Sequence, residues 1–215
     1  MINRKLNIIF VHIPKNGGSS ISSCLGLSTP WGKYPHNKAQ ALRKYVIGNI
    51  GKGFWKAATK FAVIRNPWDR LVSAFCYLNS HKLNRNDTAV KTKYLSRFNG
   101  DFKRFVLEVL VSELGSQQIG HDNLIVRNEE TLYHMYPQVY FIRGKKHLLV
   151  DHLLSFSRLQ GDFNAFCRTI GIKPRKLPHN RKSRRDQYRR YYDDETAEVV
   201  GRIYSEDVAI GNFTF

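Results

Sequence analysis

A stretch that combines a lysine, two adjacent glycines and two serines follows a short apolar run near the start of the chain. It reads Lys15-Asn16-Gly17-Gly18-Ser19-Ser20 and comes after residues 6–13, LNIIFVHI, and a proline. Adjacent glycines let backbone N–H groups turn toward an anion, and a helix start adds the positive end of its dipole. The lysine adds a full charge, and the serine hydroxyls add donors. The segment is a candidate phosphate-binding loop, although an ordinary strand-to-helix turn explains the loop alone equally well.

An arginine after a second apolar run is the other candidate anion ligand. Arg65 follows residues 61–64, FAVI, and open parallel sheets bind ligands at the carboxyl ends of their strands. Its guanidinium can grip a phosphate with two hydrogen bonds, and Ser73 lies about two helical turns further on. Taken alone, this motif is better explained by an arginine paired with an acid and by Trp68 as a core residue. Together, the two motifs suit a ligand with phosphates at both ends.

The elements around these motifs predict a single α/β domain that spans residues 1–215, with a central parallel β-sheet flanked by helices. Further apolar runs predict strands at 139–142 and 148–150, whereas 79–99 is polar and basic and is predicted to be a surface loop. Asn66 and Pro67 are suited to the cap and first position of a helix. Other helices are predicted at the start of the serine-rich segment and at 38–46, 102–114, 162–170 and 194–204.

The composition limits the partners and the compartment. The chain has 35 Lys and Arg against 17 Asp and Glu, a net charge of +18, which favours a polyanionic partner such as a nucleotide, a nucleic acid, an acidic glycan or an anionic membrane surface. Three widely separated cysteines, Cys24, Cys76 and Cys167, form no metal-binding spacing and no disulfide framework, so no metal site is expected. No apolar run is long enough for a transmembrane helix, and no signal-peptide pattern is found, which predicts a soluble, cytoplasmic protein.

Several segments resemble the PAPS-dependent carbohydrate sulfotransferases, where PAPS is the sulfuryl donor 3′-phosphoadenosine-5′-phosphosulfate. Residues 10–21 are similar to the loop that binds the 5′-phosphosulfate in this family, which includes the heparan 2-O- and chondroitin 4-O-sulfotransferases. Residues 61–75 resemble the family's 3′-phosphate segment. Residues 159–163, 177–179 and 191–196 also fit in order, more weakly. The resemblance covers nearly the whole chain and implies a fold related to P-loop nucleotide kinases, in a soluble member of bacterial type.

The resemblance implies roles for individual residues. Lys15 would contact the oxygen that bridges phosphate and sulfate, and the loop would hold the 5′-phosphate. Arg65 and Ser73 would hold the 3′-phosphate, and the basic segment near Lys182 and Ser183 would close over the nucleotide. The residues of the loop are Asn16, Gly17, Gly18, Ser19 and Ser20.

Sulfuryl transfer requires a base for the acceptor hydroxyl, and two histidines compete for that role. His36 lies between the two phosphate motifs, where the heparan 2-O-sulfotransferases have a catalytic histidine. His134 lies in His-Met-Tyr-Pro-Gln138, which resembles a His-x-x-Pro-Gln segment of relatives and could supply the base or an acceptor contact. A hydrogen-bonded structural role remains open for either histidine, and His12 is expected to be structural.

The chain departs from the family pattern at a few positions. Asn16 stands where threonine is frequent, Phe213 stands where tyrosine is common, and Ser155 and Ser157 replace a usual arginine and glutamate. The last two changes suit the joint loss of an ion pair, or they weaken donor binding if that arginine contacts the donor.

The function implied is metal-free transfer of a sulfuryl group from PAPS to a hydroxyl of a carbohydrate or glycoconjugate, and acidic acceptors are among those expected. No specific nucleic-acid partner is expected. A P-loop kinase and a non-catalytic, basic polyanion-binding module are the alternatives. Lipid, peptide and small-molecule acceptors also stay open, because the composition of the loops that would form the acceptor pocket does not indicate which acceptor binds.

Overall fold

The computed structural model describes residues 1–29, 36–80, 83–115, 132–178 and 185–215. The chain divides into two compact units. Unit 1 consists of Met1–Arg65 and Gln138–Lys182, and unit 2 consists of Asn66–Pro137 and Ser183–Phe215. The prediction of one domain for the whole chain stays a prediction.

Unit 1 is built on a four-stranded sheet with the order β1-β2-β3-β4. The pairs β2–β3 and β3–β4 are parallel, and the short β1 pairs antiparallel with β2. This confirms the predicted α/β class with a mostly parallel sheet. The strands are β1 (Ile2–Asn3), β2 (Ile8–Val11), β3 (Thr59–Ile64) and β4 (His152–Ser155).

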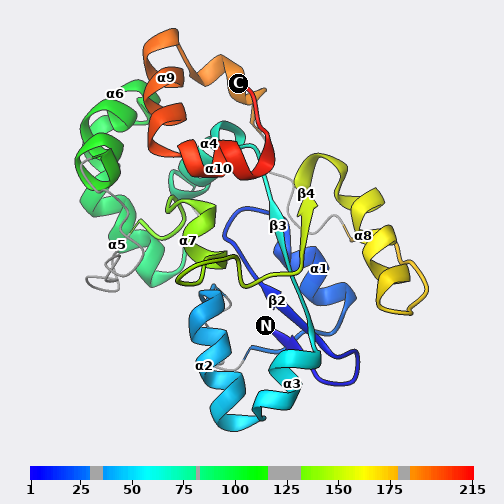
Figure 1. The fold of residues 1–215 in the computed structure, drawn as a ribbon. Coiled ribbons are helices and arrows are strands. Elements are labelled where there is room, and N and C mark those ends of the chain that lie inside the picture. Colours follow the sequence, from blue (N-terminus) through cyan, green and yellow to red (C-terminus); the bar gives the residue numbers. More distant parts are fainter. Residues whose placement is uncertain (30–35, 81–82, 116–131, 179–184) are drawn as a thin grey trace. The chain divides into compact units, whose positions relative to one another are not determined.

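Helices flank this sheet within unit 1 (Figure 1). Side chains from β2, β3 and β4 that point to one face form a common core with α1 (Gly18–Cys24) and α8 (Leu159–Thr169). Alternate residues of β2 and β3 point to the opposite face and are also buried, as expected for strands covered on both sides. They are Ile9, Val11, Ala62 and Ile64. The remaining helices of unit 1 are α2 (Ala39–Asn49), α3 (Lys52–Ala57), α7 (Gln138–Ile142) and the short 3₁₀-helix η3 (Phe156–Arg158).

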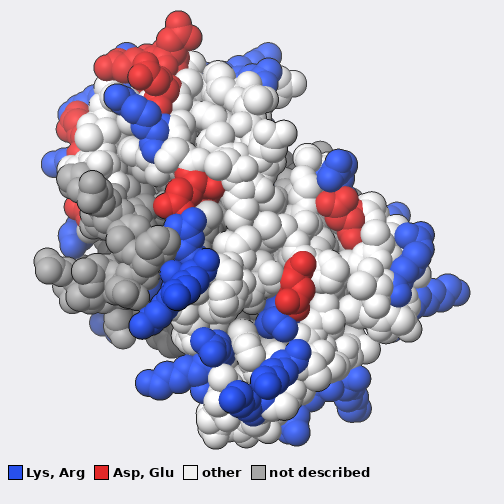
Figure 2. Space-filling view, in the orientation of Figure 1, with Lys and Arg blue, Asp and Glu red and all other residues white. Residues whose placement is uncertain are grey.

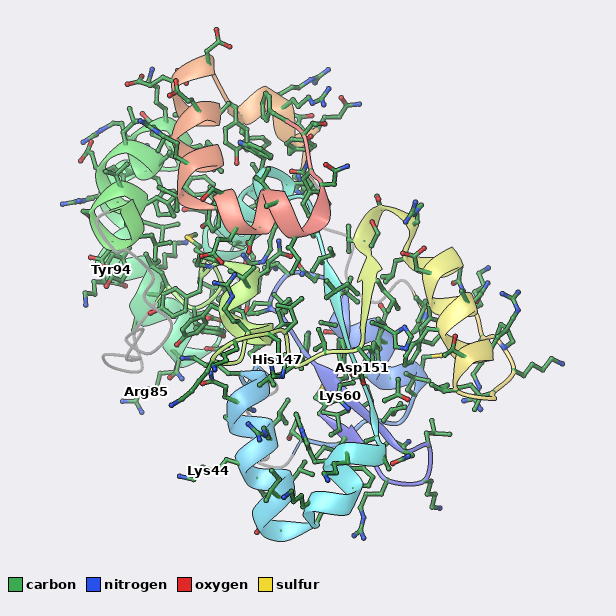
Figure 3. The ribbon with its side chains drawn as sticks, viewed as in Figure 1. Lys44, Lys60, Arg85, Tyr94, His147 and Asp151 are labelled. Carbon is green, nitrogen blue, oxygen red and sulfur yellow. The ribbon has the colours of Figure 1, made fainter. Side chains whose placement is uncertain are left out.

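An aspartate joins the beginnings of the two parallel strands β3 and β4. The Asp151 carboxylate accepts a hydrogen bond from the backbone N–H of Lys60 at 2.7 Å and forms an ion pair with the Lys60 ammonium at 3.0 Å. The backbone N–H of Asp151 donates in turn to the Lys60 carbonyl oxygen at 2.7 Å. Figure 3 shows the two labelled residues side by side. These bonds fix the register in which β4 begins.

Unit 2 is helical, and its central helix is α4 (Pro67–Leu78). As predicted, Asn66 caps this helix: its side-chain oxygen accepts from the backbone N–H groups of Trp68 and Asp69. Asp193 and Thr196 form a capping box at the start of α9. The other helical elements are α5 (Arg85–Tyr94), η1 (Ser96–Phe98), α6 (Phe102–Arg104), the π-helix η2 (Phe105–Gly115), η4 (Tyr188–Tyr191), α9 (Asp194–Ile203) and α10 (Ser205–Gly211).

Three local predictions are wrong. Residues 139–142 lie in helix α7 instead of a strand, and the last strand, β4, begins after the predicted 148–150 run. Short apolar runs that are fully buried do not distinguish a strand from a helix by periodicity. Part of the predicted loop 79–99 forms α5, because Asn84 caps it by accepting from the backbone N–H of Asp87.

Within the described residues, none of the helices is long and apolar enough to cross a membrane.

Candidate active site

The lysine- and glycine-rich loop connects β2 to α1 and has a backbone that ordinary residues rarely adopt. Lys15 has φ 69° and Gly17 has φ 75°, both in the left-handed region. A Cβ atom on Gly18 would lie 2.1 Å from the His12 ring, and one on Gly17 would lie 3.2 Å from the Phe156 ring. The loop is therefore packed tightly against aromatic rings of its own unit. Both positions need glycine, because a side chain at either one would collide with a ring.

Asn16 points inward from this loop. Its side chain is 1% exposed, and its Nδ2 donates to the Val63 carbonyl oxygen at 2.6 Å and to Gln138 Oε1 at 2.7 Å. The amide thus ties the loop to β3 and to the first residue of α7. The resemblance implied that Asn16 helps to hold the donor, and that role stays a prediction.

Arg65 follows the last residue of β3 and is 7% exposed. Its NH1 donates to the carbonyl oxygen of Lys15 at 2.7 Å, and its guanidinium carbon lies 4.0 Å from the centre of the Phe156 ring. The sequence separates the lysine-glycine motif from the arginine motif, and the fold brings them into direct contact. Two cationic side chains and a turn of backbone N–H groups consequently occur at the carboxyl ends of neighbouring strands, where α/β sheets bind anionic ligands.

His36 also belongs to unit 1, and it contacts His12. Its Nδ1 lies 3.1 Å from the His12 carbonyl oxygen, and the two ring centres are 4.3 Å apart. Because a carbonyl oxygen only accepts, Nδ1 carries the proton in this hydrogen bond, and Nε2 holds the lone pair of the neutral ring. That is the tautomer a general base requires.

The family model described as Sulfotransferase family matches residues 1–214. The chain belongs to the sulfotransferase family. In the searches against curated proteins and against solved structures, nothing matches this chain. Membership confirms the family inferred from the loop and the arginine motif, and with it a fold of the P-loop type and sulfuryl transfer as the general activity.

Further residues were also predicted for the donor site of this sulfotransferase. Ser19 and Ser20 are half-buried in the first turn of α1. Ser73 is buried in α4 of unit 2, and its role toward a 3′-phosphate stays a prediction. Lys182 and Ser183 lie outside the described residues.

His134, the second candidate base of the sulfotransferase, sits in a buried polar cluster of unit 2. Its Nε2 lies 3.0 Å from Asp87 Oδ1, and Asp87 also accepts from Tyr77 at 2.6 Å and from Asn84 at 2.7 Å. Burial alone would raise the pKa of Asp87, but the hydrogen bonds from these neighbours outweigh it and lower that pKa. This arrangement supports the structural reading of His134 that the sequence left open.

Sequence reasoning missed two buried polar residues, one in each unit, that hydrogen-bond to the backbone of predicted site segments. Arg70 of unit 2 is 1% exposed and donates to the carbonyl oxygens of Tyr136 at 2.8 Å and His134 at 3.1 Å. Gln138 of unit 1 is fully buried and bonds both the N–H and the carbonyl oxygen of Arg65. The sequence signal for Gln138 was its place in the His-x-x-Pro-Gln segment, of which only the histidine was given a role.

The departures at Ser155 and Ser157 have a simple structural outcome. Their hydroxyl oxygens lie 2.9 Å apart, so two serines hydrogen-bond to each other where an arginine and a glutamate are usual. Between them, Phe156 contacts Arg65 and the glycine loop.

The net charge of the chain resides entirely in unit 1. Unit 1 has 21 Lys and Arg against two acids, Asp151 and Asp162, a net charge of +19. Unit 2 has 14 against 15, a net charge of −1, and the two values add up to the +18 of the chain. Figure 2 shows basic side chains gathered over α2 and α3 of unit 1 and acidic ones at α9 of unit 2.

Among the described residues, no group of three or more His, Cys, Asp or Glu is placed to hold a metal ion.

Proposed function

We propose that this protein transfers the sulfuryl group of PAPS to a hydroxyl group of a carbohydrate or glycoconjugate. Family membership gives sulfuryl transfer in general, and the donor and acceptor are inferred from the site and from the resemblance of the motifs. The observation that carries the proposal is the hydrogen bond from Arg65 to the Lys15 carbonyl oxygen. It brings the arginine that we assign to one phosphate beside the loop that we assign to the other, which suits a nucleotide that is phosphorylated at both its 3′ and 5′ positions.

The residues of unit 1 divide the binding of such a donor between them. The loop from Lys15 to Ser20 supplies backbone donors to the 5′-phosphosulfate, and Arg65 supplies a planar fork to the 3′-phosphate. The net charge of +19 on unit 1 attracts the donor and speeds its association, most strongly at low ionic strength. AMP, which has no 3′-phosphate, can use only part of these contacts.

The reaction is an in-line displacement at sulfur. The acceptor oxygen forms a bond to sulfur while the bond between sulfur and the bridging phosphate oxygen breaks, and both bonding electrons leave with the nucleotide phosphate. His36 Nε2 takes the hydroxyl proton, since Nδ1 is committed to the His12 carbonyl oxygen. Lys15 stabilises the negative charge that develops on the departing 3′-phosphoadenosine-5′-phosphate (PAP).

An acidic glycan is the acceptor class that the charge distribution favours. Unit 1 contains 21 basic side chains and two acidic ones, and this charge attracts a polyanion. Several basic side chains are exposed at α2 and α3 (Figure 2). Helix α2 begins three residues after His36, so an acidic polymer bound at the start of α2 would lie near the segment that carries the proposed base.

The experiment is transfer of labelled sulfate from PAPS to a panel of acidic and neutral polysaccharides and glycolipids, with PAP release measured in parallel. We expect label in at least one carbohydrate and acceptor-dependent release of PAP, and both are expected to be lost in Lys15→Ala. Label found only in a peptide or a simple phenol would contradict the carbohydrate assignment and leave the donor assignment in place. Absence of any PAP release, with folded protein and every acceptor, would contradict the proposal.

The charge of unit 1 also favours one alternative, a polyanion-binding module without catalysis. Such a module binds heparin or nucleic acid through its net charge, and its affinity does not depend on the position of a phosphate on adenosine. Comparable affinities for PAP and for AMP, together with strong heparin binding, would identify it.

A further inference from the structure

The Gln138 side chain hydrogen-bonds to the backbone of Arg65 in the way that a residue of a neighbouring strand would. Its Nε2 donates to the Arg65 carbonyl oxygen at 2.8 Å, and its Oε1 accepts from the Arg65 N–H at 2.9 Å. Arg65 lies one residue beyond the end of β3, where strand pairing has stopped. The side-chain amide thus extends the hydrogen-bond ladder by one residue and holds the arginine's main chain on both sides.

The same side chain reaches the phosphate loop. Gln138 Oε1 also accepts from Asn16 Nδ2 at 2.7 Å, and that Nδ2 donates to the Val63 carbonyl oxygen at 2.6 Å as well. Gln138 is 0% exposed and Asn16 is 1% exposed, so water does not compete for these bonds. Four hydrogen bonds therefore connect the loop, the end of β3 and the first residue of α7 through two amides.

From this geometry we infer that Gln138 and Asn16 form an amide clamp that sets the position of Arg65 relative to the phosphate loop. Both act as positioning residues, and neither is required to touch the donor. This assigns Asn16 a role different from the direct nucleotide contact that the family resemblance implied. A threonine, frequent at this position in relatives, has a single hydroxyl donor and cannot make both of the bonds that Asn16 Nδ2 makes.

The inference rests on the proposed function, because its consequence is stated for a donor with a 3′-phosphate. If Arg65 grips that phosphate, a shift of its backbone weakens binding of PAP more than binding of AMP, which lacks the group. The discriminating quantity is accordingly the ratio of the AMP and PAP dissociation constants. A residue that only stabilises the fold changes the melting temperature without changing this ratio.

The experiment measures both dissociation constants by isothermal titration calorimetry for the full chain and for Gln138→Leu. We expect Gln138→Leu to lower the AMP-to-PAP ratio by about tenfold, the size of an effect that displaces a charge-assisted hydrogen bond. The matched control is Gln160→Leu. Gln160 also makes three hydrogen bonds in unit 1, to Asn164, Arg175 and Leu177, and its removal is expected to leave the ratio unchanged.

A second variant keeps the test decisive if Gln138→Leu does not fold. Gln138→Met has a similar length and volume but has no donor for the Arg65 carbonyl oxygen and no amide oxygen for the Arg65 N–H and Asn16, so the ratio is again expected to fall. An unchanged ratio in a folded variant of either kind would overturn the clamp. A wild-type protein that binds AMP as tightly as PAP would overturn the proposed function instead, so the two failures are distinguishable.

Discussion

Arg65 NH1 donates to the carbonyl oxygen of Lys15 at 2.7 Å, although the two residues are 50 positions apart in the chain. Lys15 itself has a left-handed backbone, with φ 69°. The guanidinium therefore supports the strained residue of the loop while it lies next to the place where an anion would bind. One contact joins two motifs that the sequence could only list separately.

Replacing Arg65 by lysine tests the need for the planar fork. Arg65→Lys keeps the charge but loses the two-pronged geometry and the contact with the Phe156 ring. We expect PAP to bind about 10- to 100-fold more weakly, which corresponds to one lost charged hydrogen bond. Calorimetric titration measures this, with Arg158→Lys as the control on an exposed arginine of the same unit. Unchanged PAP affinity in Arg65→Lys would rule out a bidentate role.

The contact between Gly18 and His12 predicts a steric conflict that a second mutation relieves. A Cβ on Gly18 would lie 2.1 Å from the His12 ring, so Gly18→Ala is expected to destabilise the protein by about 1–3 kcal/mol or more. In the double variant with His12→Ala, the space is available, and the combined loss is expected to be smaller than the sum of the single losses. Urea unfolding of all four proteins measures the coupling. Additive losses would show that the loop and the ring do not pack as described.

His36→Ala is expected to reduce sulfuryl transfer by roughly 100- to 10,000-fold, the usual effect of removing a general base. PAP affinity is expected to change little. Since the neutral ring is the active form, wild-type activity should rise with pH through the histidine range, near 6.5 for an unperturbed side chain, and the variant should lose that rise. The measurement is the pH profile of kcat for both proteins.

His134→Ala serves as the comparison, because this histidine hydrogen-bonds Asp87 in the buried cluster of unit 2. Its main expected effect is lower stability. If His134→Ala abolished transfer while stability and PAP affinity survived, His134 would be the base, and His36 would have a structural role.

The parts of this site that could be predicted from the sequence are those whose signal is local. The loop of Lys15 to Ser20 combines its lysine, glycines and serines within six residues, and Asn66-Pro67 marks the start of α4 directly. Such segments carry their own turn and capping chemistry, so no distant partner is needed to recognise them. Strands β2 and β3 were predicted because each coincides with a short, continuous apolar run.

The parts that could not be predicted depend on contacts between distant residues. Gln138 hydrogen-bonds to Arg65, 73 positions away in the chain, and to Asn16, 122 positions away. The sequence around a single glutamine does not indicate such distant partners. The run 139–142 was misassigned because α7 is buried on most sides and shows no helical period. The uneven charge of the two units became visible only when the fold had shown which segments belong together.

The buried cluster around Asp87 predicts a pH dependence of stability. The hydrogen bonds of its neighbours lower the pKa of Asp87 below its ordinary value, so the unfolded state binds its proton first as the pH falls. The stabilisation is therefore complete above the ordinary aspartate pKa, about pH 4, and is lost as the pH falls through the lower folded value.

Asp87→Asn removes this titration. At pH 7 we expect it to cost about 1–3 kcal/mol of unfolding free energy. Below pH 4 the difference between wild type and variant should shrink, and melting temperatures between pH 3 and 7 test this. A difference that is constant over the whole range would show that the carboxylate is not stabilised by its partners.

The central claim is that the chain binds a nucleotide through separate 5′- and 3′-phosphate contacts, and the affinity of the wild-type protein for PAP relative to AMP tests it most directly. Calorimetric titration of both nucleotides at one ionic strength gives the two dissociation constants. The account predicts that PAP binds at least about tenfold more tightly, because the 3′-phosphate adds a charge-assisted hydrogen bond to Arg65. Equal dissociation constants for PAP and AMP would contradict it.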